Sequence, residues 1–195
     1  MRGASILVLS ILALSGPAVA QEAAEPVPAV KPLKPAELRA EEIDRLMAKL
    51  RTAAEPERTL TEQRIWDLWQ ASDSPTAEVL LNQAQAAMDD GAPAESLSIL
   101  DRLIGAYPDF AEAWNKRATL YYLMHRDEAA LADIAKVLDL EPRHFGALAG
   151  RGLIYQREKK YALARAAFQD ALAINPGMEA IKAALKELDQ LEQGI

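Results

Sequence analysis

Proline recurs every 34 residues in the second half of the chain, at Pro108, Pro142 and Pro176. Other residues keep the same spacing, in three series: Leu80, Trp114 and Leu148; Ala84, Ala118 and Gly152; Leu100, Ile134 and Phe168. Each proline ends a helix, because the residue before a proline resists the α conformation. The period therefore predicts repeated pairs of antiparallel helices, which bury their apolar faces only by stacking on neighbouring pairs.

The rest of the chain from Ala36 onward also has a helical pattern. Alanine and leucine dominate, and no run of alternating β-branched residues predicts a strand. We therefore predict an all-α fold, an α-solenoid of antiparallel helix pairs. Its predicted parts are three repeats at 77–110, 111–144 and 145–178, followed by a capping helix at 179–193. In that last helix Ile181, Leu185 and Leu188 share one face, which suits the end of a solenoid.

The spaced residues resemble the tetratricopeptide repeat family. The second copy carries Trp114, Ala118 and Tyr121, then Ala130 and Ile134, before its proline. The third copy matches with Leu148, Gly152 and Tyr155, then Ala164 and Phe168, whereas the first is weaker, with Ala87 and Ser96 at two of the places. Membership implies a binding module. Parts of the second and third copies also resemble small exported bacterial proteins of this family that have no assigned role.

Residues 36–73 are expected to form one more helix pair, Ala36–Ala53 and Glu57–Ala71. Its repeat pattern is poor, because Leu50 stands where a small residue belongs. We interpret it as a degenerate repeat or an N-terminal cap. Its Trp66 and Trp69 are expected to pack against the first repeat. Within the repeats, Trp114 is expected to be the most costly residue to truncate.

The first 20 residues have the three-part pattern of a secretory signal peptide. Arg2 precedes an apolar run from Ala4 to Leu14, and Ala18 to Ala20 form a small-residue cleavage site. The run is too short to span a bilayer, so we expect cleavage and no stable membrane insertion of the mature chain. The proline-rich residues 21–35 are expected to be a linker, or else a docking peptide. Small-residue export signals and the lack of cysteine predict a soluble periplasmic protein.

Composition and motifs argue against a catalytic site, a metal site and nucleic-acid binding. The net charge of −7 predicts no nucleic-acid partner, and a chain without cysteine has neither thiolate catalysis nor thiolate-bound metal. The sequence contains no phosphate loop, no nucleophile elbow and no pair of histidines at metal-binding spacing. His125 is interpreted as a turn residue. We therefore predict no catalytic residues, no metal site, no cofactor and no enzyme.

In this family the first helix of each repeat lines a concave groove that holds ligands. The resemblance implies the following groove residues here: Leu81, Gln85, Met88, Asn115, Lys116, Thr119, Tyr122, Gly146, Ala149, Gly150 and Leu153, with Arg143 and His144 at its edge. Some members clamp a C-terminal carboxylate with Lys, Arg and Asn. The corresponding places here hold Leu81, Gln85, Lys116, Gly146 and Gly150, so a clamp of that kind is not expected.

Gly146 and Gly150 lie one turn apart in a predicted helix, where glycine costs about 0.5–1 kcal/mol relative to alanine. Either they allow close packing against a neighbouring helix, or they let a ligand backbone approach, with Tyr122 and Leu153 as apolar walls. We predict a periplasmic adaptor that binds a peptide or protein segment in the groove. The alternative is a self-associating scaffold, and hence a homo-oligomer.

Overall fold

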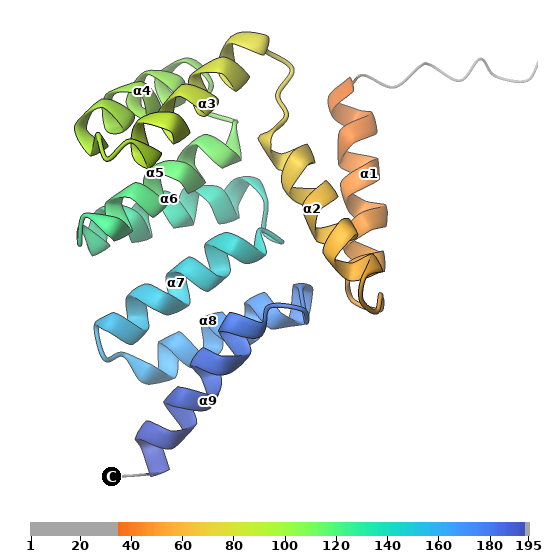
Figure 1. Ribbon diagram of the computed structural model, residues 1–195, viewed down its shortest axis with the longest axis vertical. Coiled ribbons are helices and arrows are strands. Elements are labelled where there is room, and N and C mark those ends of the chain that lie inside the picture. Colours follow the sequence, from red (N-terminus) through yellow and green to blue (C-terminus); the bar gives the residue numbers. More distant parts are fainter. Residues whose placement is uncertain (1–34, 194–195) are drawn as a thin grey trace, which may run out of the picture. The chain divides into compact units, whose positions relative to one another are not determined.

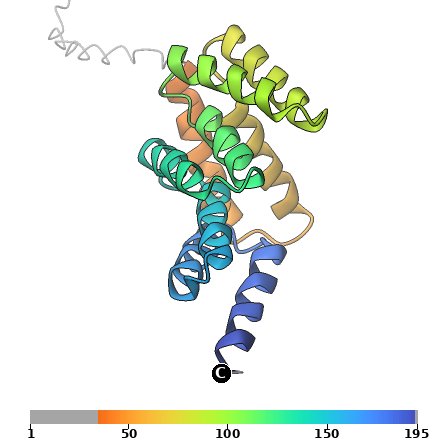
Figure 2. The same cartoon turned by 90° about the vertical axis from the view of Figure 1, so that its left-hand side faces the viewer.

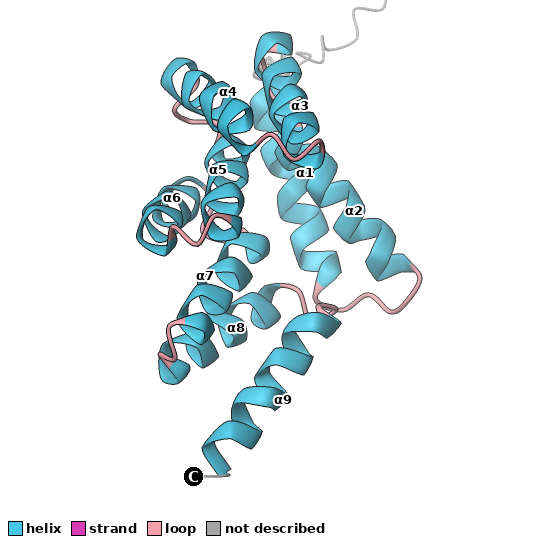
Figure 3. Cartoon of the chain, turned by 60° about the vertical axis from the view of Figure 1, so that its left-hand side comes forward, coloured by secondary structure: helices cyan, strands magenta, loops and turns pink. Residues whose placement is uncertain are grey.

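The computed structural model describes residues 35–193, which form helices and no strand. Successive helices pack as antiparallel pairs, so the predicted all-α solenoid is confirmed (Figures 1 and 3). The predicted signal peptide and most of the predicted linker lie outside the described residues. In the described part no helix is both long and apolar enough to cross a membrane.

The helices follow the predicted period closely. The N-terminal pair is α1 (Pro35–Leu50) and α2 (Glu57–Gln70), and the C-terminal helix is α9 (Glu179–Gln193). Between them lie three hairpins: α3 (Pro75–Asp89) with α4 (Pro93–Ala106), α5 (Ala111–Leu123) with α6 (Asp127–Leu140), and α7 (Phe145–Arg157) with α8 (Tyr161–Ile174). In Figure 1 these three hairpins follow one another down the stack, with α9 at the far end.

The small residues of the repeat lie where the two helices of a hairpin approach closely. A Cβ atom on Gly152 would lie 2.4 Å from the ring of Phe168, so only glycine fits at this crossing. In the first hairpin Ser96, buried in α4, donates its hydroxyl to the Ala84 carbonyl at 2.8 Å. Between hairpins, Leu120 of α5 joins the core of the first repeat and Ile154 of α7 joins that of the second. Each repeat is thus completed by its successor.

The turn inside each hairpin has one backbone geometry. Gly91, His125 and Lys159 occupy equivalent places and have positive φ angles of 70°, 57° and 59°. In all three, the N–H of the following residue donates to the carbonyl five positions back, at 2.8 Å. This is the hydrogen bond of a Schellman-type helix end, which favours glycine in the left-handed position. The period therefore fixes the backbone even where the residue is not glycine.

Replacing Lys159 with glycine is expected to stabilise the protein by about 0.5–1 kcal/mol. The left-handed conformation is strained for a residue with a Cβ atom, and this gain exceeds the entropy that glycine adds to the unfolded chain. Urea unfolding followed by circular dichroism measures the difference. Gly91→Ala is the matched opposite change and should destabilise; no atom lies within 4 Å of its new Cβ, so strain alone acts. Equal stability of Lys159→Gly and the parent would contradict the argument.

The junction between the first and second hairpins is held by Arg117. Its guanidinium bonds Asp101 of α4 and Asp133 of α6, each at 2.7 Å. The bonds to Asp133 raise the pKa of Arg117 above its ordinary value, so the side chain stays charged. The same guanidinium lies 5.0 Å from the Trp114 ring centre, and the Trp114 indole donates to the Pro108 carbonyl at 2.9 Å. Trp114 is only half-buried, so it is less central to the core than expected.

Trp66 and Trp69 do not pack against the first repeat, so that expectation was wrong. Trp69 stacks on the imidazole of His144, with ring centres 4.1 Å apart, and its ring centre lies 5.0 Å from that of Phe145. Trp66 contacts the same two residues edge-on. Both partners lie at the start of α7, where the second repeat ends and the third begins. The two tryptophans thus share a core with Ile43, Met47, Leu50, Ile65, Leu68 and Phe145.

The pair runs along the edge where the loops between hairpins gather. At one end of the pair, Ala36 and Arg39 of α1 line a shared pocket with Tyr107 and Pro108, in the loop after α4. Farther along, Asp44 accepts a 2.6 Å bond from Arg143, in the loop after α6. Arg58 then lies against Gly177, in the loop after α8, where a Cβ atom would be 2.4 Å from its Cδ. Figures 1 and 2 show α1 and α2 beside the stack rather than at its first end.

Candidate binding groove

An apolar pocket of about 280 Å³ lies between α5 and α7. Its floor is formed by buried residues of the second and third repeats, among them Ala118, Ile134 and Ile154. Asn115 and Thr119 are its polar side chains. The full lining is Asn115, Ala118, Thr119, Tyr122, Leu123, Ile134, Gly146, Ala147, Ala149, Gly150, Leu153 and Ile154. Such a lining suits an apolar group guided by few hydrogen bonds.

Two glycines of α7 line this pocket and have different roles. The Cβ of a residue at position 146 would lie 2.6 Å from Trp66, so Gly146 makes room for the N-terminal pair. The expected close packing against a helix is therefore found at Gly146, but the helix is α2 of the N-terminal pair and not a helix of a neighbouring repeat. At Gly150 the nearest atom to a new Cβ is Cδ1 of Ile134 at 3.6 Å, an ordinary contact. Gly150 therefore deepens the pocket without being required by packing.

A buried polar pair supports the groove from behind. Glu112 and His144 are 1% and 0% exposed, and Oε2 of Glu112 lies 3.2 Å from Nε2 of His144. His144 Nδ1 accepts the backbone N–H of Ala147 at 3.1 Å and so caps α7. Nε2 therefore carries the hydrogen that Glu112 accepts. The same carboxylate accepts from the Asn115 amide at 3.1 Å, which fixes a polar group of the pocket wall.

Arg157 holds the other wall. Its guanidinium lies 4.0 Å from the Tyr122 ring centre and donates to the Tyr122 carbonyl at 3.1 Å. It also pairs with Asp127 at the start of α6. A planar cation on an aromatic face, bonded to the backbone as well, restricts the ring. Tyr122 is therefore a positioned wall rather than a freely rotating side chain.

The structure brings together seven of the predicted groove residues: Asn115, Thr119, Tyr122, Gly146, Ala149, Gly150 and Leu153. Three others lie outside the pocket. Lys116 is 3.7 Å from the Glu112 carboxylate, Gln85 donates to Asp89 at 2.8 Å, and Met88 is partly buried against the core of the first repeat.

Three more predicted groove residues lie outside the pocket and take part in packing or ion pairs within the fold. Leu81 is 2% exposed and belongs to the core of the first repeat, because an apolar side chain at this place turns inward. His144 is fully buried beneath Trp69. Arg143 is bound to Glu141 and to Asp44 of α1, and its bonds to Glu141 raise its pKa above the ordinary value. Leu81 and His144 are therefore not groove residues, and Arg143 joins the loop after α6 to α1.

Sequence reasoning missed Ile134 and Ile154 as parts of the pocket, and Arg157 as the residue that holds its Tyr122 wall. Arg157 has no sequence signal, since the equivalent places in the earlier repeats hold Leu123 and Asp89. In the sequence, Ile134 stands out only as a member of a 34-residue series. Among residues 35–193, no three acidic or histidine side chains gather in a way that could hold a metal ion.

Comparison with known proteins places this geometry in a family. The sequence matches the tetratricopeptide repeat over residues 81–131 and again over residues 145–178. A TPR repeat-containing protein of Rhizobium etli is 34% identical over 135 residues, which are 69% of this chain and 66% of the relative. The Protein SGT1 homolog of Bos taurus is 27% identical over 60% of this chain and 35% of its own length. The chain thus spans about two thirds and one third of these relatives.

Solved structures share the fold. The first TPR of Spaghetti (RPAP3), bound to the HSP90 peptide SRMEEVD, superposes with a TM-score of 0.59 at 20% identity, covering 62% of this chain and 96% of that chain. MamA gives 0.57 at 18% identity, over 72% of this chain and 86% of its own. Identities this low show the fold alone. The matched repeats, the Rhizobium relative and the three stacked hairpins together establish that this chain belongs to the tetratricopeptide repeat family.

Proposed function

We propose that the chain is a protein–protein interaction module that binds a peptide segment of another protein in the groove between α5 and α7. The pocket of about 280 Å³ is the observation that carries this proposal. It lies toward the small end of ligand sites, which suits one apolar side chain of a peptide rather than a whole cofactor. The proposal assigns the chain binding and no catalysis.

The walls favour a particular kind of peptide. The apolar floor takes an aliphatic or aromatic side chain, because burial of such a group stabilises a complex by about 1.5–3 kcal/mol. The amide of Asn115, fixed by Glu112, lies where a peptide backbone can bond it. The RPAP3 domain, a fold relative, holds a peptide, and this supports peptide binding as the use of the groove.

The comparison with RPAP3 also indicates which kind of peptide this groove does not suit. The peptide on RPAP3 ends in Glu-Glu-Val-Asp, and a tail of that kind needs cations to pair with its carboxylates. At the clamp places this chain offers Leu81, buried in the core, Gln85 and two glycines. Its one cation there, Lys116, already faces the Glu112 carboxylate. We therefore propose an apolar anchor, not an acidic tail, as the recognised feature.

Filling the pocket tests the proposal. Gly150→Leu is expected to lower partner recovery at least about tenfold, because the new side chain occupies the space of the ligand's anchor. The fold should remain intact or gain stability, since position 150 has room for a Cβ and leucine favours helix more than glycine does. Affinity purification from cell-envelope extract with quantitative mass spectrometry measures recovery, and circular dichroism measures folding.

Leu163→Ala is the matched control. Leu163 is a half-exposed leucine on α8, away from the pocket, so its loss should leave recovery unchanged. Tyr122→Ala and Leu153→Ala should weaken recovery by removing pocket walls. If the variants at Gly150, Tyr122 and Leu153 recover the captured proteins as well as the parent does, groove binding is contradicted, whatever those proteins are.

We also propose that the module works in the periplasm. Support comes from the sequence of residues 1–20 alone, with its short apolar run and its Ala18–Ala20 site. The exported protein is then expected to begin at Gln21. Intact-mass analysis of the protein from a periplasmic fraction checks this, and a full-length species confined to the cytoplasm would contradict it.

A further inference from the structure

The first repeat exposes a surface that the other two repeats bury. Ala113 and Ala147 occupy equivalent places in α5 and α7, pack on the preceding hairpin and are at most 1% exposed. The equivalent residue of α3 is Val79, and it is 53% exposed. Leu120 and Ile154 are likewise buried against the preceding hairpin, whereas their counterpart Ala86 is exposed. We call this surface of α3 and α4 the leading face.

The leading face contains an open groove of about 550 Å³ between α3 and α4. Its lining comes entirely from these two helices and their turn, and includes Gln83, Ala86, Asp90, Glu95, Ser98 and Arg102. In the second repeat, α4 lies along the corresponding surface of α5. The N-terminal pair precedes the first repeat in sequence but lies along the loop edge instead. The leading face therefore continues the repeat-to-repeat interface without an occupant among the described residues.

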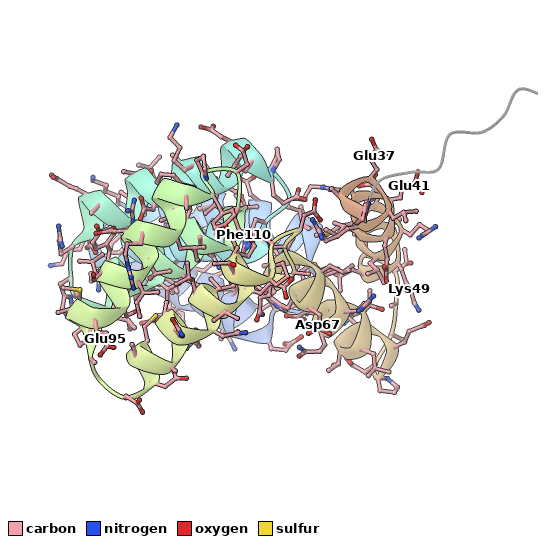
Figure 4. All side chains as sticks on the ribbon, turned by 90° about the horizontal axis from the view of Figure 1, so that it is seen from above. Glu37, Glu41, Lys49, Asp67, Glu95 and Phe110 are labelled. Atoms are coloured by element: carbon pink, nitrogen blue, oxygen red, sulfur yellow. The ribbon has the colours of Figure 1, made fainter. Side chains whose placement is uncertain are left out.

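Charge is unevenly distributed along this groove. The hydrogen bond from Ser96 to Ala84 fixes which residues of the two antiparallel helices lie opposite each other. Asp90 and Glu95 consequently lie at the turn end, and Arg102 lies near the level of Val79 at the other end. Figure 4, which looks onto this end of the stack, places Glu95 at the end of the hairpin far from α1. None of these three side chains has an ion-pair partner within residues 35–193.

We propose that the leading face binds the leading face of a second copy of this chain about a two-fold axis. An antiparallel arrangement sets Arg102 of each copy opposite Asp90 and Glu95 of the other, so the charges are complementary. It also sets Val79 opposite the small Ala86, which allows α3 of the two copies to approach closely. The interface buries the surface that later repeats bury against their predecessors.

A second copy fits this end better through its own leading face than through its far end. At the far end, α9 covers α8 with Ile181 and Leu188 and turns Lys182, Lys186 and Glu187 outward. Stacking that surface on the leading face would bury three charged groups of α9, and the cost of removing them from water can exceed what ion pairing returns. The two-fold arrangement is also closed, so it stops at a dimer.

Sedimentation equilibrium of the whole protein over a wide concentration range tests the proposal. We expect a monomer–dimer equilibrium. Val79→Arg and Arg102→Glu should each raise the dimer dissociation constant at least about tenfold, since each change acts twice across a two-fold interface. Both residues are exposed, so both variants should fold. Adding Glu95→Arg to Arg102→Glu should recover most of the lost affinity by restoring opposite charges.

Lys136→Glu is the matched control, because Lys136 is the equivalent of Arg102 in the second repeat, outside the leading face. It should leave the equilibrium unchanged. A protein that stays monomeric at every concentration overturns the proposal. So does a dimer that Val79→Arg and Arg102→Glu leave intact. A foreign helix on this face would also overturn it, and would show as Val79-dependent binding of another protein to the monomer.

Discussion

Trp69→Ala is expected to destabilise the protein by about 3–5 kcal/mol, the usual cost of truncating a large aromatic residue in a core. Trp69 is 7% exposed, stacks on His144 and contacts Phe145, so its loss opens a cavity where α2 meets the third repeat. Native domains hold only about 5–15 kcal/mol in total. The variant should therefore lose α1 and α2 from the fold at temperatures where the parent is native. Urea unfolding followed by circular dichroism measures the change.

Trp114→Ala is the control with the same chemical change. Trp114 is half-buried and lies beneath the Arg117 guanidinium at the junction of two repeats. Its truncation should cost less than that of Trp69, because part of the lost surface already faces solvent. If Trp114→Ala proves the more damaging, then α2 contributes little to stability. The repeats would then not depend on the N-terminal pair.

Glu112→Ala is expected to lower the free energy of unfolding by about 3 kcal/mol, far more than truncation of a surface carboxylate would. Removal of this buried side chain leaves the Nε2–H of His144 without an acceptor in a site closed by Trp69, and releases Asn115. A buried donor left without its partner loses its full solvation. Glu112→Gln should cost only about 1 kcal/mol, because its amide oxygen can still accept from His144.

Stability and binding measurements on both variants separate two roles of this carboxylate. Glu112→Gln should keep partner recovery close to that of the parent, whereas Glu112→Ala should lower it by releasing Asn115 in the pocket wall. Asp101→Ala is a suitable comparison, since Asp101 is an exposed carboxylate that pairs with Arg117 and should cost about 1 kcal/mol or less. Equal costs for Glu112→Ala and Asp101→Ala would contradict the assigned importance of the buried pair.

The sequence by itself determined the repeats. Their contacts are local, since each hairpin packs on the hairpins before and after it, and a period of 34 residues therefore specifies both helices and their stacking. The same locality explains the turns, where His125 and Lys159 adopt the left-handed conformation of Gly91. It also explains Gly152, because the period places a small residue where α7 packs against Phe168. The groove walls at Tyr122 and Leu153 follow from the same period.

Only the tertiary structure decided where the N-terminal pair packs. The contacts of His144, Arg143 and Gly146 follow from that position. These contacts join residues far apart in the chain, so no local spacing records them. A signal exists in hindsight: Phe145 and Gly146 depart from the repeat, which has Ala111 and Glu112 at those places in the second copy. The large residue fills the space under Trp69, and the small one admits Trp66. A repeat pattern specifies neighbours, whereas a surface shared by distant segments is specified only by complementary shape in the folded chain.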